Sequence, residues 1–193
     1  MKKNLLVVVD MVNGFTSFGA LADTRIQAII PNIERAVKIA KSKGYMMVAF
    51  KDCHQMGDEE FKTFPPHCLK GTAEAELVPE LKKYEKDFFV IEKNTTNGFN
   101  TYAFKKLITS FIFDNVYVVG CCTDICVKDF SLSLKNFLNK NQIKTNVTVL
   151  SDMVSTFDSP THSAYDATKE TFEQLKGAGI TVRESTLNNQ CQK

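Results

Sequence analysis

Three cysteines lie within six consecutive positions of the chain, in the stretch VVGCCTDICV. Cys121, Cys122 and Cys126 have the spacing C-C-x3-C with no second cysteine pair downstream, which argues against a structural zinc site. The first two belong to a predicted strand-to-helix turn and are expected to have packing or backbone roles. Thr123 or Asp124 can cap the following helix, which places Cys126 in its first turn. Free N–H groups and the helix dipole stabilise a thiolate there, so Cys126 is a candidate nucleophile; the alternative is a buried structural thiol.

Two charged residues directly follow predicted strands elsewhere in the chain. Asp10 comes after the apolar run Leu5 to Val9, and Lys93 comes shortly after Phe89 to Ile91. In open α/β sheets, ligands bind outside the carboxyl ends of the strands, so both side chains lie where a site would form. Taken alone, Asp10 could equally cap the next turn, and Lys93 could be a solvated lysine.

A long segment after the second predicted strand is rich in Asp, Glu, Pro and Gly and holds two of the three histidines of the chain. Asp52 and His54 are two residues apart, which in an extended segment directs both side chains to the same side. Glu60 and His67 follow in DCHQMGDEEFKTFPPH. Carboxylates and imidazoles suit zinc, manganese or iron(II) alike. The segment therefore predicts a divalent-metal site, and the alternative is a hydrated acidic loop.

Six short apolar runs predict the strands that must position these side chains. They are Leu5 to Val9, Tyr45 to Phe50, Phe88 to Ile91, Val116 to Val119, Val147 to Leu150 and Ile180 to Val182. Segments with helical period lie between most of them, and His162 near the start of the last one is expected to cap or pack. This alternation predicts a three-layer α/β/α fold with a mainly parallel, doubly wound sheet of about six strands.

Length and composition fit one globular domain. The chain has 193 residues, of which 44% are hydrophobic and 24% are charged, enough to bury a core without metals or disulfides as staples. We expect a single domain over residues 1–186 and a polar tail over 187–193, where Cys191 is incidental. No apolar run approaches the roughly 20 residues of a membrane span. The net charge is +2 and there is no long basic run, so the charge pattern does not indicate nucleic-acid binding.

The amino terminus, MKKNLLVVVD, has an apolar part too short for a signal peptide, and this part ends at an acid. It predicts a first strand in a cytoplasmic protein. In that compartment the six cysteines are expected to be reduced thiols.

Asp10 in VVVDMVNGF, Lys93 in IEKNTTNGF and Cys126 in VVGCCTDICV together resemble the Asp-Lys-Cys triad of the isochorismatase-like cysteine hydrolases. The triad of that family occurs in this order at these strand ends. The resemblance extends from residue 5 to about residue 182. It implies a hydrolase in which the aspartate takes the thiol proton, the lysine stabilises the charged pair and the cysteine attacks the substrate.

Within this family, DCH followed by FPPHCLKGT resembles the nicotinamidases, amidases that bind a divalent metal beside the triad. The resemblance carries the metal ligands over to Asp52, His54 and His67. It implies one divalent ion, with zinc as the first choice and manganese or iron as alternatives.

The fourth metal ligand is where this chain departs from the commonest pattern. That pattern has a further histidine in the intervening loop, which this sequence lacks. Some nicotinamidases use a glutamate instead, and Glu60 best fits the spacing. Asp58 and Glu59 are close enough to remain alternatives.

The resemblance implies hydrolysis of nicotinamide to nicotinate and ammonia through a thioester on Cys126, as part of NAD salvage. The backbone N–H groups of Cys122 and Cys126 would form the oxyanion hole. The peptide bond between Cys121 and Cys122 is expected to be cis, which would aim the first of these donors.

Aromatic side chains are expected to enclose the flat substrate ring. The resemblance points to Phe15 and Phe64, with Phe99, Tyr102 and Cys122 as further lining. In a chain with 15 phenylalanines, aromatic residues at these positions could equally belong to the core.

Two other functions remain open from the sequence. One is a related cysteine amidase that acts on another small amide or a carbamoyl compound. The other is a non-catalytic thiol protein of the same fold, acting as a redox sensor or binding module. The leading expectation for partners is the small-molecule substrate nicotinamide, and a homo-oligomer is left open.

Overall fold

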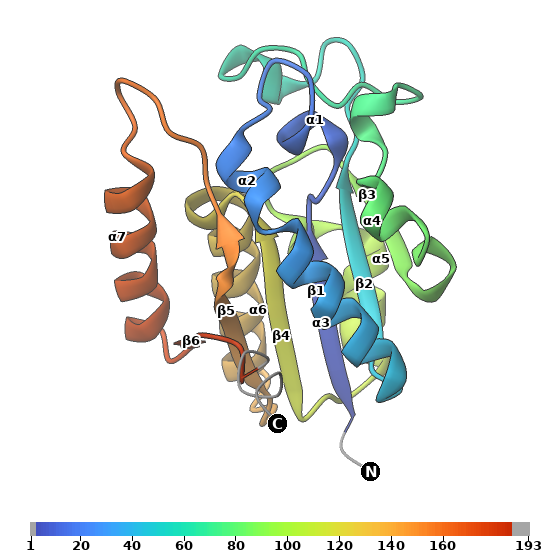
Figure 1. The fold of residues 1–193 in the computed structure, drawn as a ribbon. Coiled ribbons are helices and arrows are strands. Elements are labelled where there is room, and N and C mark those ends of the chain that lie inside the picture. The colour runs from blue at the N-terminus through green and yellow to red at the C-terminus, as the bar shows by residue number, and fades with distance from the viewer. Residues whose placement is uncertain (1–2, 187–193) are drawn as a thin grey trace, which may run out of the picture.

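Six parallel strands form one sheet in the computed structural model, which describes residues 3–186 (Figure 1). They are β1 (Asn4–Val9), β2 (Met46–Asp52), β3 (Phe89–Lys93), β4 (Asn115–Cys121), β5 (Asn146–Ser155) and β6 (Thr181–Arg183). The order across the sheet is β3-β2-β1-β4-β5-β6, so the chain winds outward from β1 in both directions. The predicted doubly wound sheet is confirmed, and every strand pair in the described residues is parallel. The predicted tail at 187–193, with Cys191, lies outside the described residues.

Helices cover both faces of this sheet (Figure 1). One face carries α1 (Asn13–Thr16), α2 (Thr24–Ala28), α3 (Ile30–Ser42) and α4 (Pro79–Lys82). The other carries α5 (Tyr102–Ser110), α6 (Lys128–Lys140) and α7 (Ala164–Gly177). Short 3₁₀ turns are η1 (Glu59–Lys62), η2 (Ala73–Ala75), η3 (Glu85–Asp87) and η4 (Gly98–Asn100), and η5 (Thr123–Val127) is a π-helical turn. The described part of the chain has no helix long and apolar enough to cross a membrane.

The central strand β1 explains why the apolar runs are continuous. Leu5, Val7 and Val9 belong to the core between the sheet and α5–α7. Leu6 and Val8 belong to the core on the opposite face, against α3. Successive side chains of a strand point to opposite faces, so a strand covered on both sides must be apolar throughout.

Strand β5 differs most from its prediction. The apolar run predicted Val147 to Leu150, whereas the strand continues to Ser155 through the polar residues of SDMVS. Its pairing with β4 shifts in register between Val118 and Gly120. The irregular, partly polar second half carries no periodic apolar signal, so sequence pattern alone did not show it.

Gly120 allows β4 to pass close to β1 just before the cysteine turn. Its φ is +117°, and a Cβ at this position would lie 2.0 Å from the carbonyl oxygen of Val9. Gly120→Ala is therefore expected to lower the free energy of unfolding by about 3 kcal/mol or more, through backbone strain and overpacking. Urea denaturation measures this change. Gly177→Ala is the matched control because nothing lies within 4 Å of its added Cβ, and equal stability of the two variants would contradict the prediction.

Candidate active site

Asp10, Lys93 and Cys126 come together at the carboxyl end of the sheet. Asp10 directly follows β1, Lys93 ends β3 and Cys126 lies in η5 after β4. Lys93 Nζ is 2.7 Å from Asp10 Oδ2 and 3.8 Å from Cys126 Sγ. All three residues are buried, with Cys126 the most accessible at 8% exposure. The structure thus brings the three candidates into one contact group.

The turn around Cys126 is wound differently from the predicted helix start. The peptide bond between Cys121 and Cys122 is cis, as the resemblance implied, and the Val127 N–H donates to the Cys122 carbonyl over five residues. The expected side-chain cap from Thr123 or Asp124 is wrong, since the described residues provide no such bond for this turn. The Asp124 carboxylate instead binds groups of the loop after β5.

Cys121, which was expected to have a packing or backbone role, bonds through its side chain to the backbone of Asp10. Its thiol donates to the main-chain carbonyl of Asp10 over 3.2 Å, and its side chain is fully buried. Asp10 has a φ of +52°, an unusual conformation for a residue other than glycine. Cys121 therefore helps to hold the backbone of the aspartate that faces Lys93.

Burial controls the protonation of the triad. It raises the pKa of Asp10 to about 7, with Lys93 opposing and the charge of Asp52 adding to the rise. Burial also raises the pKa of the Cys126 thiol well above its ordinary value, although Lys93 acts in the other direction. The pKa of Lys93 stays well above its usual range because nearby anionic groups outweigh burial. Burial therefore favours the protonated thiol of Cys126, which needs a base, in line with the expected role of Asp10.

A second buried group lies next to the triad. The possible ligand atoms of Asp52, His54, Glu60 and His67 all lie within 4.8 Å of one another. The Nε2 atoms of both histidines are 3.0 Å from Asp52 Oδ2. Glu60 Oε1 is 3.9 Å from His67 Nε2. These are the four residues that the sequence predicted as metal ligands.

The donor chemistry of this group fits a cation. The carbonyl of Pro65 can only accept, so His67 Nδ1 donates to it over 2.8 Å. In a neutral imidazole the lone pair is then on Nε2, which faces the Asp52 carboxylate. His54 Nδ1 similarly lies 3.0 Å from a carboxylate oxygen of Asp58. A bound cation would satisfy lone pairs that converge in this way, and two imidazoles with two carboxylates suit zinc, manganese or iron(II).

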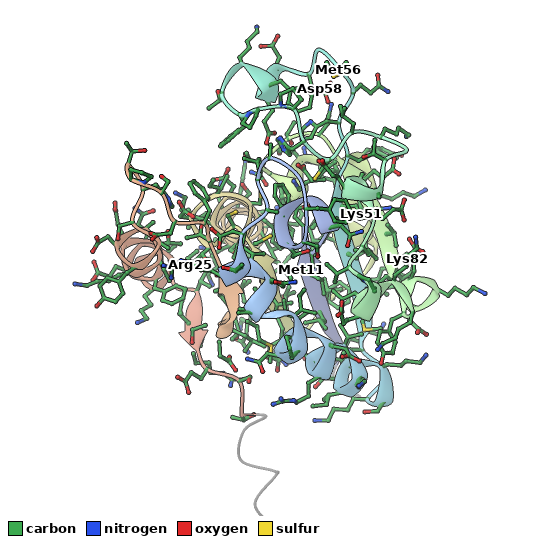
Figure 2. The ribbon with its side chains drawn as sticks, turned by 45° about the horizontal axis from the view of Figure 1, so that its top comes forward. Met11, Arg25, Lys51, Met56, Asp58 and Lys82 are labelled. Carbon is green, nitrogen blue, oxygen red and sulfur yellow. The ribbon has the colours of Figure 1, made fainter. Side chains whose placement is uncertain are left out.

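Asp58 and Glu59, the alternatives to Glu60, have other partners. Asp58 Oδ2 contacts His54 Nδ1 and accepts the Gln55 N–H, on the loop that rises beyond the sheet end (Figure 2). Glu59 is exposed and pairs with Lys62 over 2.6 Å. A carboxylate behind a metal-binding histidine orients the ring and raises its basicity. This supporting role of Asp58 was not predicted, and its position four residues after His54 is the only sequence signal for it.

Lys93 connects the two groups. Its Nζ is 2.7 Å from Asp52 Oδ1 as well as 2.7 Å from Asp10 Oδ2. Burial disfavours the charge of Asp52, but Lys93 and the two imidazoles outweigh it and hold its pKa below the ordinary value. The triad and the candidate metal ligands therefore form one continuous electrostatic unit.

A cavity of about 300 Å³ opens beside this unit. Its lining includes Cys126 from the triad, Glu60 and His67 from the candidate metal ligands, and three of the predicted pocket residues, Phe15, Phe64 and Cys122. The other lining residues were not predicted and are Ala20, Leu21, Ala22, Asp23, Ile125, Phe157 and Asp158. Phe157 comes two residues after β5, so the strand-end rule would have found it had the full length of that strand been recognised.

The two remaining predicted pocket residues lie elsewhere. The Phe99 ring packs against those of Phe104 and Phe137, at centroid distances of 5.9 and 5.6 Å, within the core beneath α5 and α6. Tyr102 begins α5 and is 80% exposed. Neither residue lines the cavity. The 3₁₀ turn η4 directs Phe99 inward, and the helix start leaves Tyr102 in solvent.

The fold and this site define a three-layer α/β/α protein with a buried Asp-Lys-Cys cluster at the carboxyl end of its sheet. The chain matches the Isochorismatase domain over residues 4–183 and belongs to that family. It is 35% identical to "Nicotinamidase 1" of Arabidopsis thaliana over 179 residues, which cover 83% of this chain and 72% of that protein.

A further relative and a solved structure show the range of similar proteins. "Probable inactive nicotinamidase At3g16190" of Arabidopsis thaliana is 24% identical over 84% of this chain and 86% of that protein. The pyrazinamidase of Pyrococcus horikoshii, solved in complex with zinc, is 26% identical with a TM-score of 0.78, covering 95% of this chain and 99% of that one. Members of this family thus differ in activity, and the substrate of this chain depends on its own site.

Proposed function

We propose that this protein is a nicotinamidase that hydrolyses nicotinamide to nicotinate and ammonia. The observation that carries the proposal is one cavity lined both by Cys126 and by His67 and Glu60 of the candidate metal group. A substrate needs an electrophilic amide at one end and a metal-binding atom at the other to use both, and nicotinamide has its carboxamide and its pyridine nitrogen. Phe15 and Phe64 supply apolar walls for a flat ring. The similarity to a nicotinamidase supports this choice.

The proposed reaction begins with a proton transfer from Cys126 to Asp10. The thiolate attacks the carboxamide carbon and forms a tetrahedral intermediate, while cationic Lys93 balances the negative charge. Asp10 then gives the proton to the leaving nitrogen and the C–N bond breaks. Ammonia departs, and the acyl group remains bound to Cys126 as a thioester. Water, deprotonated by Asp10, hydrolyses the thioester to nicotinate, and the proton returns to the thiol.

Backbone donors are proposed to stabilise the oxyanion in both steps. The N–H groups of Cys122 and Cys126 lie on the turn that follows β4, and both side chains line the cavity. Preorganised N–H donors in a water-excluded site are a large source of transition-state stabilisation.

The candidate metal ligands would bind the other end of the substrate in this proposal. Asp52, His54, Glu60 and His67 would hold one divalent ion, which when bound supplies a Lewis acid for the ring nitrogen. Zinc is the first choice, supported by the zinc complex of the similar pyrazinamidase, with manganese or iron as alternatives. In this proposal the enzyme acts in the cytoplasm, in salvage of nicotinamide toward NAD.

Ammonia release from nicotinamide, with and without a chelator, tests substrate and metal together. We expect turnover with nicotinamide and pyrazinamide that a chelator abolishes and added metal restores. Turnover of a carbamoyl substrate but of neither pyridine-type amide would show the related amidase instead. Hydrolysis of no amide in the panel would place this chain with the inactive relative.

His67→Ala is expected to weaken metal binding by at least about 100-fold, because it removes a ligand rather than a supporting residue. Competition with a chromophoric chelator measures the affinity, and elemental analysis measures the metal content. Glu59→Gln is the matched control: its carboxylate is adjacent to Glu60 but exposed and paired with Lys62. Unchanged affinity in His67→Ala, or an equal loss in Glu59→Gln, would contradict the assignment.

A further inference from the structure

His162 connects the loop after β5 to the turn that carries the candidate nucleophile. Its Nε2 is 2.8 Å from Asp124 Oδ2, and its Nδ1 is 3.1 Å from the Phe157 carbonyl oxygen. Thr156 Oγ1 donates to the other oxygen of Asp124 over 2.6 Å. We call these four residues, Asp124, Thr156, Phe157 and His162, the His162 network. It joins two segments of the chain that both contribute to the cavity.

Phe157 is the member of this network that lines the cavity. Its ring lies nearly parallel to the His162 imidazole, with centroids 4.1 Å apart and planes 16° apart. The imidazole thus contacts Phe157 twice, through its ring face and through the main-chain carbonyl. A half-buried loop aromatic held in this way has little freedom to turn away from the cavity.

The other attachments of this loop are more exposed, and one of them is the Asp158 N–H, which donates to Asp23 Oδ2 over 3.3 Å. Asp158 pairs with Arg25 over 3.2 Å, but the two side chains are 45% and 56% exposed. Arg25 extends from α2 toward the segment that leads into α7 (Figure 2). Exposed ion pairs contribute little because water screens them. Asp124 and His162 are less accessible, at 14% and 24%, so the His162 network is the stronger restraint.

We infer that Phe157 is a specificity-determining wall of the substrate cavity and that His162 is the positioning residue that holds it there. The inference rests on the proposed function only for its substrate, a flat aromatic amide. The ring of such a substrate gains an aromatic contact when Phe157 is fixed and loses it when the loop moves. Asp124 is two residues before Cys126, so the same network also ties this wall to the nucleophile turn.

The donors and acceptors of the His162 network suggest a conservative substitution at Asp124. Asp124 and the Phe157 carbonyl are both acceptors, so His162 makes both hydrogen bonds only when both ring nitrogens carry protons. In Asp124→Asn, the amide oxygen can still accept from Thr156, and the amide nitrogen can donate to Nε2 of a neutral imidazole. Asp124→Asn therefore preserves the connections, whereas Asp124→Ala removes them.

Steady-state kinetics of five variants tests the inference. His162→Ala, Phe157→Ala and Asp124→Ala are expected to raise KM for nicotinamide about tenfold, the upper range for one aromatic contact, with kcat changed less than about threefold. Asp124→Asn is expected to keep KM within about twofold of wild type. Tyr165→Ala is the control, since this nearby aromatic is 75% exposed on α7 and is expected to change neither constant.

The division between KM and kcat separates positioning from a general structural role. Disturbance of the Cys126 turn would lower kcat, so a loss of kcat at unchanged KM in His162→Ala would overturn the inference. Unchanged KM in Phe157→Ala would also overturn it. Thermal denaturation shows whether each variant is folded. Any unfolded variant is replaced by Phe157→Leu, which keeps an apolar side chain but lacks the flat ring. Phe157→Leu is expected to raise KM similarly.

The activity of the wild type on the amide panel tests the proposed function separately from the role of Phe157. If wild type hydrolyses another amide of the panel but not nicotinamide, the proposed function fails, and the variants are compared on that amide. The same rise in KM there supports the wall, and no rise overturns it. If wild type hydrolyses no amide, both the function and the wall are overturned.

Discussion

Cys126→Ala is expected to reduce ammonia release from nicotinamide by at least about 10⁴-fold, because it removes the proposed nucleophile and with it the thioester route. The thiol lies 3.8 Å from Lys93 Nζ and lines the cavity, so alanine leaves the rest of the site in place. Wild type should form an acyl adduct of Cys126 that mass spectrometry detects after rapid quenching. The alanine variant should form none.

Cys53→Ala is the matched control for this prediction. Cys53 is a partly exposed thiol just after β2, at a strand end but outside the triad, and its loss should leave turnover unchanged. Full activity in Cys126→Ala would contradict covalent catalysis. Reversible oxidation of Cys126 by peroxide, in a wild type that hydrolyses no amide, would favour a redox sensor instead.

Asp10→Asn is expected to lower kcat by about 10² to 10⁴-fold, the range for loss of a general acid–base. The amide matches the carboxylate in size but cannot take the thiol proton. The base is essential because burial keeps the Cys126 thiol protonated at rest. Steady-state ammonia release measures the change. Asp166→Asn, an exposed carboxylate in the first turn of α7, serves as the control and should remain fully active.

The pH dependence of kcat/KM provides a second test of the role of Asp10. Its pKa is raised to about 7, so the carboxylate form that accepts a proton becomes scarce below that pH. Wild-type kcat/KM should therefore rise with pH up to about 7, and fall about tenfold per unit on the acid side. The residual activity of Asp10→Asn should lack this acid limb. An unchanged limb in the variant would show that another group titrates.

Strand positions were predictable because they follow from local chemistry. A strand buried on both faces must be continuously apolar, and β1 satisfies this requirement from Leu5 to Val9. The rule that sites form at strand ends then selected Asp10, Lys93 and the turn before Cys126. The same reasoning failed at β5, whose second half is only partly apolar and is irregularly paired.

The residue types of the candidate metal ligands were predictable, but the choice of the fourth ligand among neighbouring acids was not. Residue types and spacing indicated Asp52, His54, Glu60 and His67, whereas the family resemblance left Asp58 and Glu59 as alternatives to Glu60. The fold of the η1 turn separates these acids. Glu60 faces His67, while Asp58 supports His54 from the opposite side of its ring.

The pocket aromatics were the least predictable part. Phenylalanine has the same chemistry in a core as in a cavity wall, so the sequence could not distinguish Phe99 from Phe64. Phe157 was missed because its neighbours show no periodic pattern. Its position depends on His162 and Asp124, which are 38 residues apart in the chain.

Local periodicity in the sequence was enough to predict the parallel α/β architecture, while residue chemistry together with the family resemblance selected the candidate triad and the candidate metal residues. Tertiary structure alone decided that Lys93 contacts both Asp10 and Asp52 at 2.7 Å, that burial keeps Cys126 protonated, and which aromatics enclose the cavity. These properties depend on distances between segments remote in the chain and on the exclusion of water. Both arise only when the strands and loops pack together.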